Sequence, residues 1–212
     1  MNLPNKLTIF RIILVPIMVI IPFFNLQGDF LGIPITYLII DLIFIIASIT
    51  DKLDGTIARK NNQVTNFGKF LDPIADKILV VAALIMFVEM GRIPAWIPIV
   101  VIFREFAVSG YRLIAVQNNG KVIAANIWGK LKTVTQMLAI IFMFLTTHPY
   151  FAFVFRTSSK VEAIIYSAKI YMSTGEFIIN ILASVLLTLS VIATIFSGYE
   201  YLKDGKDLLK DC

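Results

Sequence analysis

Long apolar runs separated by short polar segments make up most of this chain. The hydrocarbon core of a bilayer is about 30 Å thick, so a helix that crosses it needs about 20 mostly apolar residues. The pattern predicts six such helices, preceded by a short interfacial N-terminal segment. The predicted spans are Leu7–Phe24, Thr36–Arg59, Leu71–Met90, Pro94–Gln117, Leu131–Phe153 and Phe177–Tyr201.

Composition leads to the same class of protein. Hydrophobic residues make up 58% of the 212 residues, charged residues only 16%, and the mean hydropathy is +0.84. Soluble domains carry about 25% charged residues, so this composition excludes a disordered chain and argues against a soluble globule. The single cysteine, Cys212, excludes an intramolecular disulfide. We expect an all-α integral membrane protein with one domain over residues 1–212, whose first span is retained rather than cleaved as a signal peptide.

The basic residues are unevenly distributed over the predicted loops. The net charge is +5, and most Lys and Arg residues fall beside the two termini and in the 60–70 and 118–130 loops. By the positive-inside rule these segments face the cytosol, and the charge reflects orientation in a cell membrane rather than nucleic-acid binding. We therefore expect a multi-pass membrane protein with both termini in the cytosol. The stretch 147–176, part apolar and part basic, predicts an interfacial helix on the outer face.

Four aspartates stand out between the second and third predicted spans. Asp51 and Asp54 are three residues apart, and Asp72 and Asp76 are four apart, so each pair shares one helix face. An antiparallel helix pair would bring all four carboxylates together, and they cannot all stay ionised there unaided. Oxygen ligands without nearby Cys or His favour Mg²⁺, Mn²⁺ or Ca²⁺, and four carboxylates suit two ions about 3.5–4 Å apart. The alternative is ordinary loop aspartates paired with neighbouring lysines.

The residues between these aspartates favour a ligand site. Gly55 and Ala58 would let a bulky ligand approach the helix backbone, and Arg59 suits a phosphate. Asp51 lies roughly 22 Å along its span from Thr36, at 1.5 Å per residue. The site would therefore lie just inside the cytosolic leaflet, where a lipid headgroup and a water-soluble molecule can meet.

This set of residues resembles the signature of the CDP-alcohol phosphotransferase family at every specified position. The matching positions are Asp51, Asp54, Gly55, Ala58, Arg59, Gly68, Asp72 and Asp76. The resemblance implies that an alcohol displaces CMP from a CDP-linked lipid. It implies two divalent ions, Mg²⁺ or Mn²⁺, held by the four aspartates, with Asp76 as general base. Asp54, Gly55, Ala58, Arg59 and Gly68 would bind the CDP-lipid.

Cationic residues in the fourth and fifth spans bear on the identity of the alcohol. Arg104 and Arg112 are eight residues apart on one helix face, and Lys130, Lys132 and Thr133 open the next helix. These residues, over 104–133, suit an acceptor that carries its own phosphate. Two structural roles are the alternatives. The lysines could serve only as positive-inside anchors, and Arg104 could form a structural ion pair with its neighbouring glutamate.

Four short stretches of the sequence resemble those of the bacterial phosphatidylglycerophosphate synthases within that family. The matching stretches are residues 2–11, 71–77, 104–106 and 128–133. The resemblance implies CDP-diacylglycerol as donor and sn-glycerol 3-phosphate as acceptor, with Thr8 and Arg11 among the residues that bind the acceptor phosphate. It also implies a homodimer in the bacterial cytoplasmic membrane. Other acceptors remain as alternatives, namely those that would yield cardiolipin, phosphatidylinositol phosphate or phosphatidylserine. A divalent-cation transporter is the rival from another class, since carboxylates in spans also mark ion paths.

Overall fold

The computed structural model describes residues 3–24, 26–60, 66–117, 127–151 and 173–204, and this part of the chain is built on six long helices. The helices are α1 (Leu3–Ile20), α2 (Ile35–Lys60), α3 (Asn66–Glu89), α4 (Trp96–Gln117), α5 (Ile127–Phe144) and α7 (Thr174–Asp204). A short 3₁₀ helix, η1 (Ile21–Phe24), extends α1. Two strands, β1 (Asp29–Phe30) and β2 (Ile33–Pro34), form a hairpin before α2.

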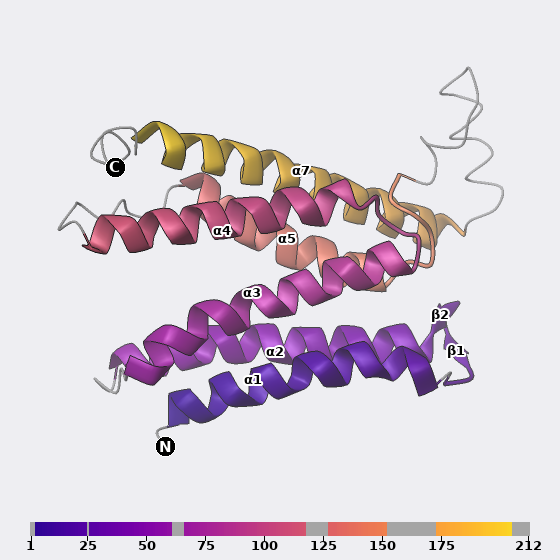
Figure 1. Ribbon diagram of the computed structural model, residues 1–212. Helices are drawn as coiled ribbons and strands as arrows, with labels where there is room; N and C mark the ends of the chain where they lie inside the picture. The colour runs from indigo at the N-terminus through magenta and orange to yellow at the C-terminus, as the bar shows by residue number, and fades with distance from the viewer. Residues whose placement is uncertain (1–2, 25, 61–65, 118–126, 152–172, 205–212) are drawn as a thin grey trace.

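The helices lie side by side along a common direction in two groups (Figure 1). One group holds α1, α2 and α3, and the other holds α4, α5 and α7; the most extensive contact is between α5 and α7. α1 begins and α7 ends at the same end of the bundle, while the β1–β2 hairpin lies at the other end. This arrangement agrees with an even number of helices that place both termini on one side.

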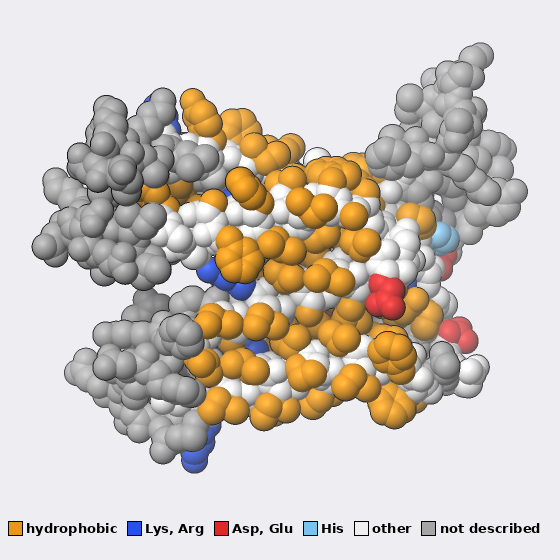
Figure 2. Space-filling model, viewed as in Figure 1, with side chains coloured by type: hydrophobic (Ala, Val, Ile, Leu, Met, Phe, Trp, Pro, Cys, Tyr) orange, Lys and Arg blue, Asp and Glu red, His pale blue; other side chains and the backbone are white. Residues whose placement is uncertain are grey.

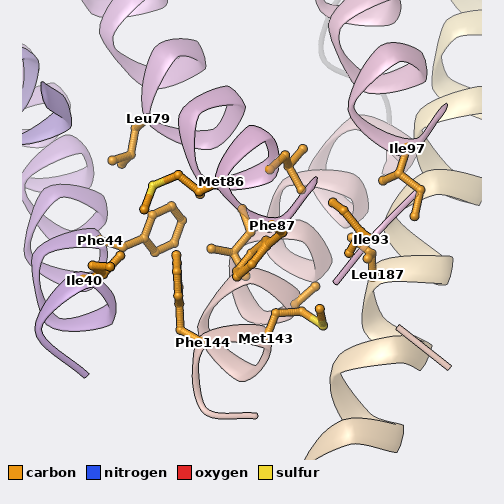
Figure 3. Packing of buried hydrophobic residues seen from close by; sticks show 14 of the residues in the cluster. Ile40, Phe44, Leu79, Met86, Phe87, Ile93, Ile97, Met143, Phe144 and Leu187 are labelled. Atoms are coloured by element: carbon orange, nitrogen blue, oxygen red, sulfur yellow. The ribbon is translucent and has the colours of Figure 1, made fainter. Parts of the chain in front are cut away.

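Aromatic and aliphatic side chains join the two groups. Phe87 of α3 and Phe144 of α5 are fully buried, with ring centroids 4.4 Å apart. Phe44 of α2 lies beside them, and Leu187 of α7 packs from the other side (Figure 3). Dispersion contacts of this kind are what hold helices together in a membrane, where lipid is as apolar as the core.

The outer surface is largely hydrophobic, as a lipid-facing surface would be (Figure 2). In the described part of the chain, three segments are long and apolar enough to cross a membrane: Asn5–Phe24, Ile127–Phe144 and Thr174–Tyr201. The helices α2, α3 and α4 are longer than α1 and α5, but each of them carries more charged residues than either of those two. A predominantly helical fold is therefore confirmed, together with three candidate spans.

A glycine turn ends α3. Gly91 has φ +67°, its N–H donates to Val88 O at 2.9 Å, and the N–H of Arg92 donates to Phe87 O at 2.8 Å. This pair of bonds is a Schellman motif with glycine at its left-handed position. The turn reverses the chain into α4 and places Arg92 inside the bundle.

The guanidinium of Arg92 helps to end α5. It donates to the carbonyl oxygens of Met143 at 2.7 Å and Thr146 at 2.5 Å, and it lies 4.2 Å from the Tyr37 ring centroid. α5 consequently ends at Phe144, whereas the sequence predicted a helix to Phe153. The apolar run continues past the helix end, but Arg92 satisfies carbonyls that a further turn would have used.

Other features also differ from prediction, and α5, for example, begins at Ile127 rather than Leu131. α3 begins at Asn66 rather than Leu71, so the α2–α3 connection is shorter than the loop of about ten residues that we expected. α1 begins at Leu3, which leaves no separate N-terminal segment in the described residues. The hairpin was not predicted; its turn residues Leu31 and Gly32 both have positive φ, as a type I′ turn requires. The predicted outer interfacial helix falls largely on residues 152–172, outside the described part.

Candidate functional site

A cavity of about 570 Å³ lies between α3, α4, α5 and α7, nearer the end of the bundle where α5 begins and α7 ends. Basic side chains appear among the hydrophobic ones between the two helix groups in Figure 2. The charged or hydroxyl-bearing residues that line it are Asp76, Lys77, Arg104, Glu105, Lys130, Lys132, Thr133 and Tyr201. The structure thus places the predicted base and four predicted acceptor-phosphate residues around one space.

The four motif aspartates lie on α2 and α3, as their spacing predicted. Asp51 and Asp54 fall in the last turns of α2, and Asp72 and Asp76 fall in the first half of α3. The side chains of Asp54 and Asp72 are outside the described part of the structure. Asp76 of α3 lies near enough to Asp51 of α2 for the two carboxylates to interact electrostatically.

The donors that are described fit a hard divalent cation only in part. Asp51 and Asp76 offer carboxylate oxygens, the donor type that Mg²⁺ and Mn²⁺ prefer. Among the described side chains, no three His, Cys, Asp or Glu residues form a cluster. Asp51 and Asp76 therefore supply one half of the predicted ligand set.

Arg11 occupies a different place from the one expected of an acceptor ligand. Its Nη1 lies 2.6 Å from Asp51 Oδ1, and its side chain is fully buried. Thr8, one turn earlier on the same face of α1, is buried as well. Neither residue lines the 570 Å³ cavity, so α1 contributes its cation to the aspartate region instead.

A network of charges forms the wall of the cavity on α4 and α5. Glu105 accepts a hydrogen bond from Lys132 Nζ and lies 3.0 Å from Arg104 Nη1. Lys132 is 7% exposed, so its interaction with Glu105 is made in a largely water-free setting. A buried carboxylate shared by two cations lowers the cost of burying them, and it keeps both facing the cavity.

Two further predicted residues line the same cavity from α5. Lys130 is exposed, and its charge is available to an anion that enters the cavity from the end of the bundle where α5 begins. The Thr133 hydroxyl donates to Gly129 O at 3.0 Å, a bond within its own helix. Because the Thr133 hydroxyl already donates to the backbone, it is a weaker candidate for a phosphate ligand than the cations.

Several cavity residues were not predicted. Lys77 follows Asp76 directly, and its Nζ donates to Ser109 Oγ of α4. Tyr201 and Ser197 reach the region from α7, more than sixty residues along the chain from the nearest motif. Lys77 was within the recognised motif, but no spacing signal in the sequence points to α7.

The remaining predicted residues lie in described helices, but their side chains are outside the described part. In α2 and α3 these are Gly55, Ala58, Arg59 and Gly68, and in α4 it is Arg112. Their predicted contacts with the CDP-lipid and the acceptor phosphate stay predictions.

Comparison with known proteins agrees with the geometry. The family model described as CDP-alcohol phosphatidyltransferase matches residues 1–196. A Bacillus subtilis protein named CDP-diacylglycerol--glycerol-3-phosphate 3-phosphatidyltransferase is 42% identical, covering 99% of this chain and 97% of its own. A Haemophilus influenzae protein of the same name is 38% identical over 99% and 96%. A probable phosphatidylglycerophosphate synthase of Mycobacterium tuberculosis is 37% identical over 66% of this chain and 64% of its own.

Proposed function

This chain belongs to the CDP-alcohol phosphatidyltransferase family, and we propose that it transfers the phosphatidyl group of CDP-diacylglycerol to sn-glycerol 3-phosphate. The products are phosphatidylglycerophosphate and CMP. The observation that carries this proposal is the cavity in which Asp76 is grouped with Arg104 and Lys132. A carboxylate suits the reacting hydroxyl, and two cations suit the phosphate on the same small acceptor.

The reaction needs a base, and Asp76 is the residue in position. The primary hydroxyl of the acceptor attacks the phosphorus that bears the diacylglycerol, a new P–O bond forms, and the pyrophosphate P–O bond breaks. CMP leaves with the bonding electron pair, and the hydroxyl proton passes to a carboxylate oxygen of Asp76. Asp76 lies on the cavity wall within reach of a small molecule held there.

The four aspartates would hold two divalent ions, Mg²⁺ or Mn²⁺. When bound, the ions neutralise the pyrophosphate and make CMP a better leaving group. In the structure, the Arg11 guanidinium lies beside Asp51 and supplies positive charge there. Gly55, Ala58, Arg59 and Gly68 are proposed to receive the cytidine diphosphate part, on the strength of the family motif.

The acceptor phosphate is assigned to Arg104, Lys130 and Lys132, with Arg112 and Thr133 as weaker candidates. Glu105 already neutralises part of the charge on Arg104 and Lys132. Phosphate binding therefore completes the charge balance of two cations that share one carboxylate. An acceptor without net negative charge, such as inositol or serine, would gain no charge neutralisation from these cations.

The proposed setting is a bacterial cytoplasmic membrane. All six helices cross it, both termini and the cavity face the cytosol, and the protein forms a homodimer. The common direction of the helices and the shared end at which α1 begins and α7 ends support this topology. A single domain holds both the aspartate region at 51–76 and the acceptor region at 104–133.

The test is CMP release by the purified protein in detergent. CDP-diacylglycerol is supplied with Mg²⁺ or Mn²⁺, with and without sn-glycerol 3-phosphate. We expect release that depends on both the metal and the acceptor. Release only with phosphatidylglycerol, inositol phosphate or serine would replace the acceptor assignment, and cation flux into sealed vesicles without CMP release would favour a transporter.

A further inference from the structure

Arg104 is held by side chains of its own helix, α4, and of α7. Its Nη1 lies 3.0 Å from Glu105 on α4, and its Nη2 donates to Ser197 Oγ on α7. The guanidinium carbon lies 5.8 Å from the ring centroid of Tyr201, also on α7. Ser197 and Tyr201 are four residues apart, so they form one strip on the same helix face.

Two glycines make room for the Arg104 side chain. A Cβ on Gly198 of α7 would lie 3.4 Å from Arg104 Cγ, at the tight limit of an ordinary contact. A Cβ on Gly129 of α5 would lie 3.7 Å from both Arg104 Nη2 and Ser197 Oγ. The arginine stem therefore passes close over the bare backbone of Gly198, which a larger residue would push away.

Tyr201 closes the cavity at the same point. Its side chain is 3% exposed, and it lines both the 570 Å³ cavity and an apolar cavity of about 260 Å³ between α4 and α7. Arg104 is the other residue of the acceptor site that borders both spaces. Tyr201 thus stands beside Arg104 at the boundary between a polar and an apolar region.

We propose that Ser197, Gly198 and Tyr201 of α7 are positioning residues that set acceptor affinity by holding the Arg104 guanidinium at the cavity wall. This inference rests on the proposed function, in which Arg104 binds the acceptor phosphate. An arginine side chain has many rotamers, and a site that holds it in place before binding loses less entropy when the phosphate arrives. Ser197 is neutral, so its hydrogen bond orients the guanidinium without reducing the charge offered to phosphate.

The first experiment is steady-state kinetics of Ser197→Ala. Loss of one hydrogen bond to a charged group predicts a rise of roughly three- to tenfold in KM for sn-glycerol 3-phosphate. KM for CDP-diacylglycerol and kcat should stay within about twofold, and inorganic phosphate should inhibit less well in the same proportion. Ser197→Thr keeps the hydroxyl and should restore the wild-type KM.

The matched control is Ser190→Ala. Ser190 is on the same helix and equally buried, but its hydroxyl donates to Leu187 O within α7. Its kinetics should match those of the wild type. Gly198→Val supplies a second variant: a Cβ there already lies 3.4 Å from Arg104 Cγ, so the two further methyl groups should press on the arginine stem and raise the same KM.

The outcomes separate this inference from the proposed function. If wild-type CMP release does not depend on sn-glycerol 3-phosphate, the proposed function fails and this inference fails with it. If the wild type uses that acceptor but Ser197→Ala and Gly198→Val leave its KM unchanged, only the positioning role is overturned. If Ser197→Ala weakens the affinity for both substrates equally, and Ser190→Ala does the same, the cause is a general packing effect. That result would also overturn the positioning role.

Discussion

Arg11 of α1 and Asp51 of α2 form a buried ion pair, with Nη1 and Oδ1 2.6 Å apart. Arg11 has no exposed side-chain surface, while Asp51 keeps 34% of its own. The pair joins α1 to the first of the four motif aspartates. A carboxylate that is proposed to bind a cation is thus balanced by a guanidinium in the structure.

Replacing Arg11 with Gln should destabilise the protein in a metal-dependent way. The unpaired Asp51 carboxylate should cost about 1–2 kcal/mol, less than for a fully buried pair because water reaches Asp51. Added Mg²⁺ or Mn²⁺ should recover part of that loss, since a cation then takes over the neutralising role. Thermal unfolding in detergent with and without metal measures both effects. Lys6→Gln, an exposed change on the same helix, is the control; an Arg11→Gln deficit that metal leaves unchanged would contradict the idea.

Replacing Asp76 with Asn should abolish turnover. Asn keeps the shape of the side chain but accepts no proton, so CMP release should fall by about 10²–10⁴-fold. Binding of CDP-diacylglycerol, followed by equilibrium titration, should be largely spared. Asp29→Asn, in the hairpin at the opposite end of the bundle, should leave the rate unchanged. Near-wild-type turnover of Asp76→Asn would rule out its role as base.

Replacing Lys132 with Gln should weaken acceptor binding selectively. The change removes a cation from the cavity wall and leaves Glu105 paired with Arg104 alone. KM for sn-glycerol 3-phosphate should rise by about tenfold or more, as for loss of a charge-assisted contact to phosphate. KM for the CDP-lipid should change little. The acceptor assignment would be wrong if the lipid KM rose instead.

Replacing Arg92 with Ala should affect stability without affecting substrate affinity. Arg92 donates to the carbonyls of Met143 and Thr146 at the end of the bundle away from the cavity. Loss of these bonds and of the stacking on Tyr37 should cost about 2–4 kcal/mol of unfolding free energy. The unfolding free energy of Arg92→Lys should lie between those of the wild type and Arg92→Ala, because one ammonium group cannot make all the hydrogen bonds of a guanidinium. Unfolding curves and both KM values test this, and a raised KM with unchanged stability would contradict it.

The proposed orientation predicts which ends of the bundle face outward. In a Cys212→Ser background, Leu31→Cys places a thiol in the hairpin, where Leu31 is 82% exposed. A membrane-impermeant maleimide should label it from outside intact cells. Lys6→Cys, on exposed surface near the start of α1, should react only after the membrane is opened. The reverse pattern would invert the topology.

Most of the helical framework was predictable from the apolar pattern. α2 and α4 end where the sequence placed them, within a residue, because charges and polar loops follow the apolar runs directly. The end of α5 was not predictable, because it depends on Arg92, which approaches from the α3–α4 turn. The membership of Arg104 and Lys132 in one site was predicted, but the glutamate that both share was weighed only as a partner of Arg104.

Hydropathy and the spacing of like residues are local properties of the chain, so the class of protein and the grouping of the four aspartates could be predicted from them. The sequence also indicated which cations to examine. The packing of the helices sets which of these cations lie together: Arg11 pairs with Asp51, whereas Arg104 contacts Ser197 and Tyr201 across the α4–α7 contact. Such pairings depend on how the helices pack. A single sequence holds no local pattern that shows which distant residues come into contact.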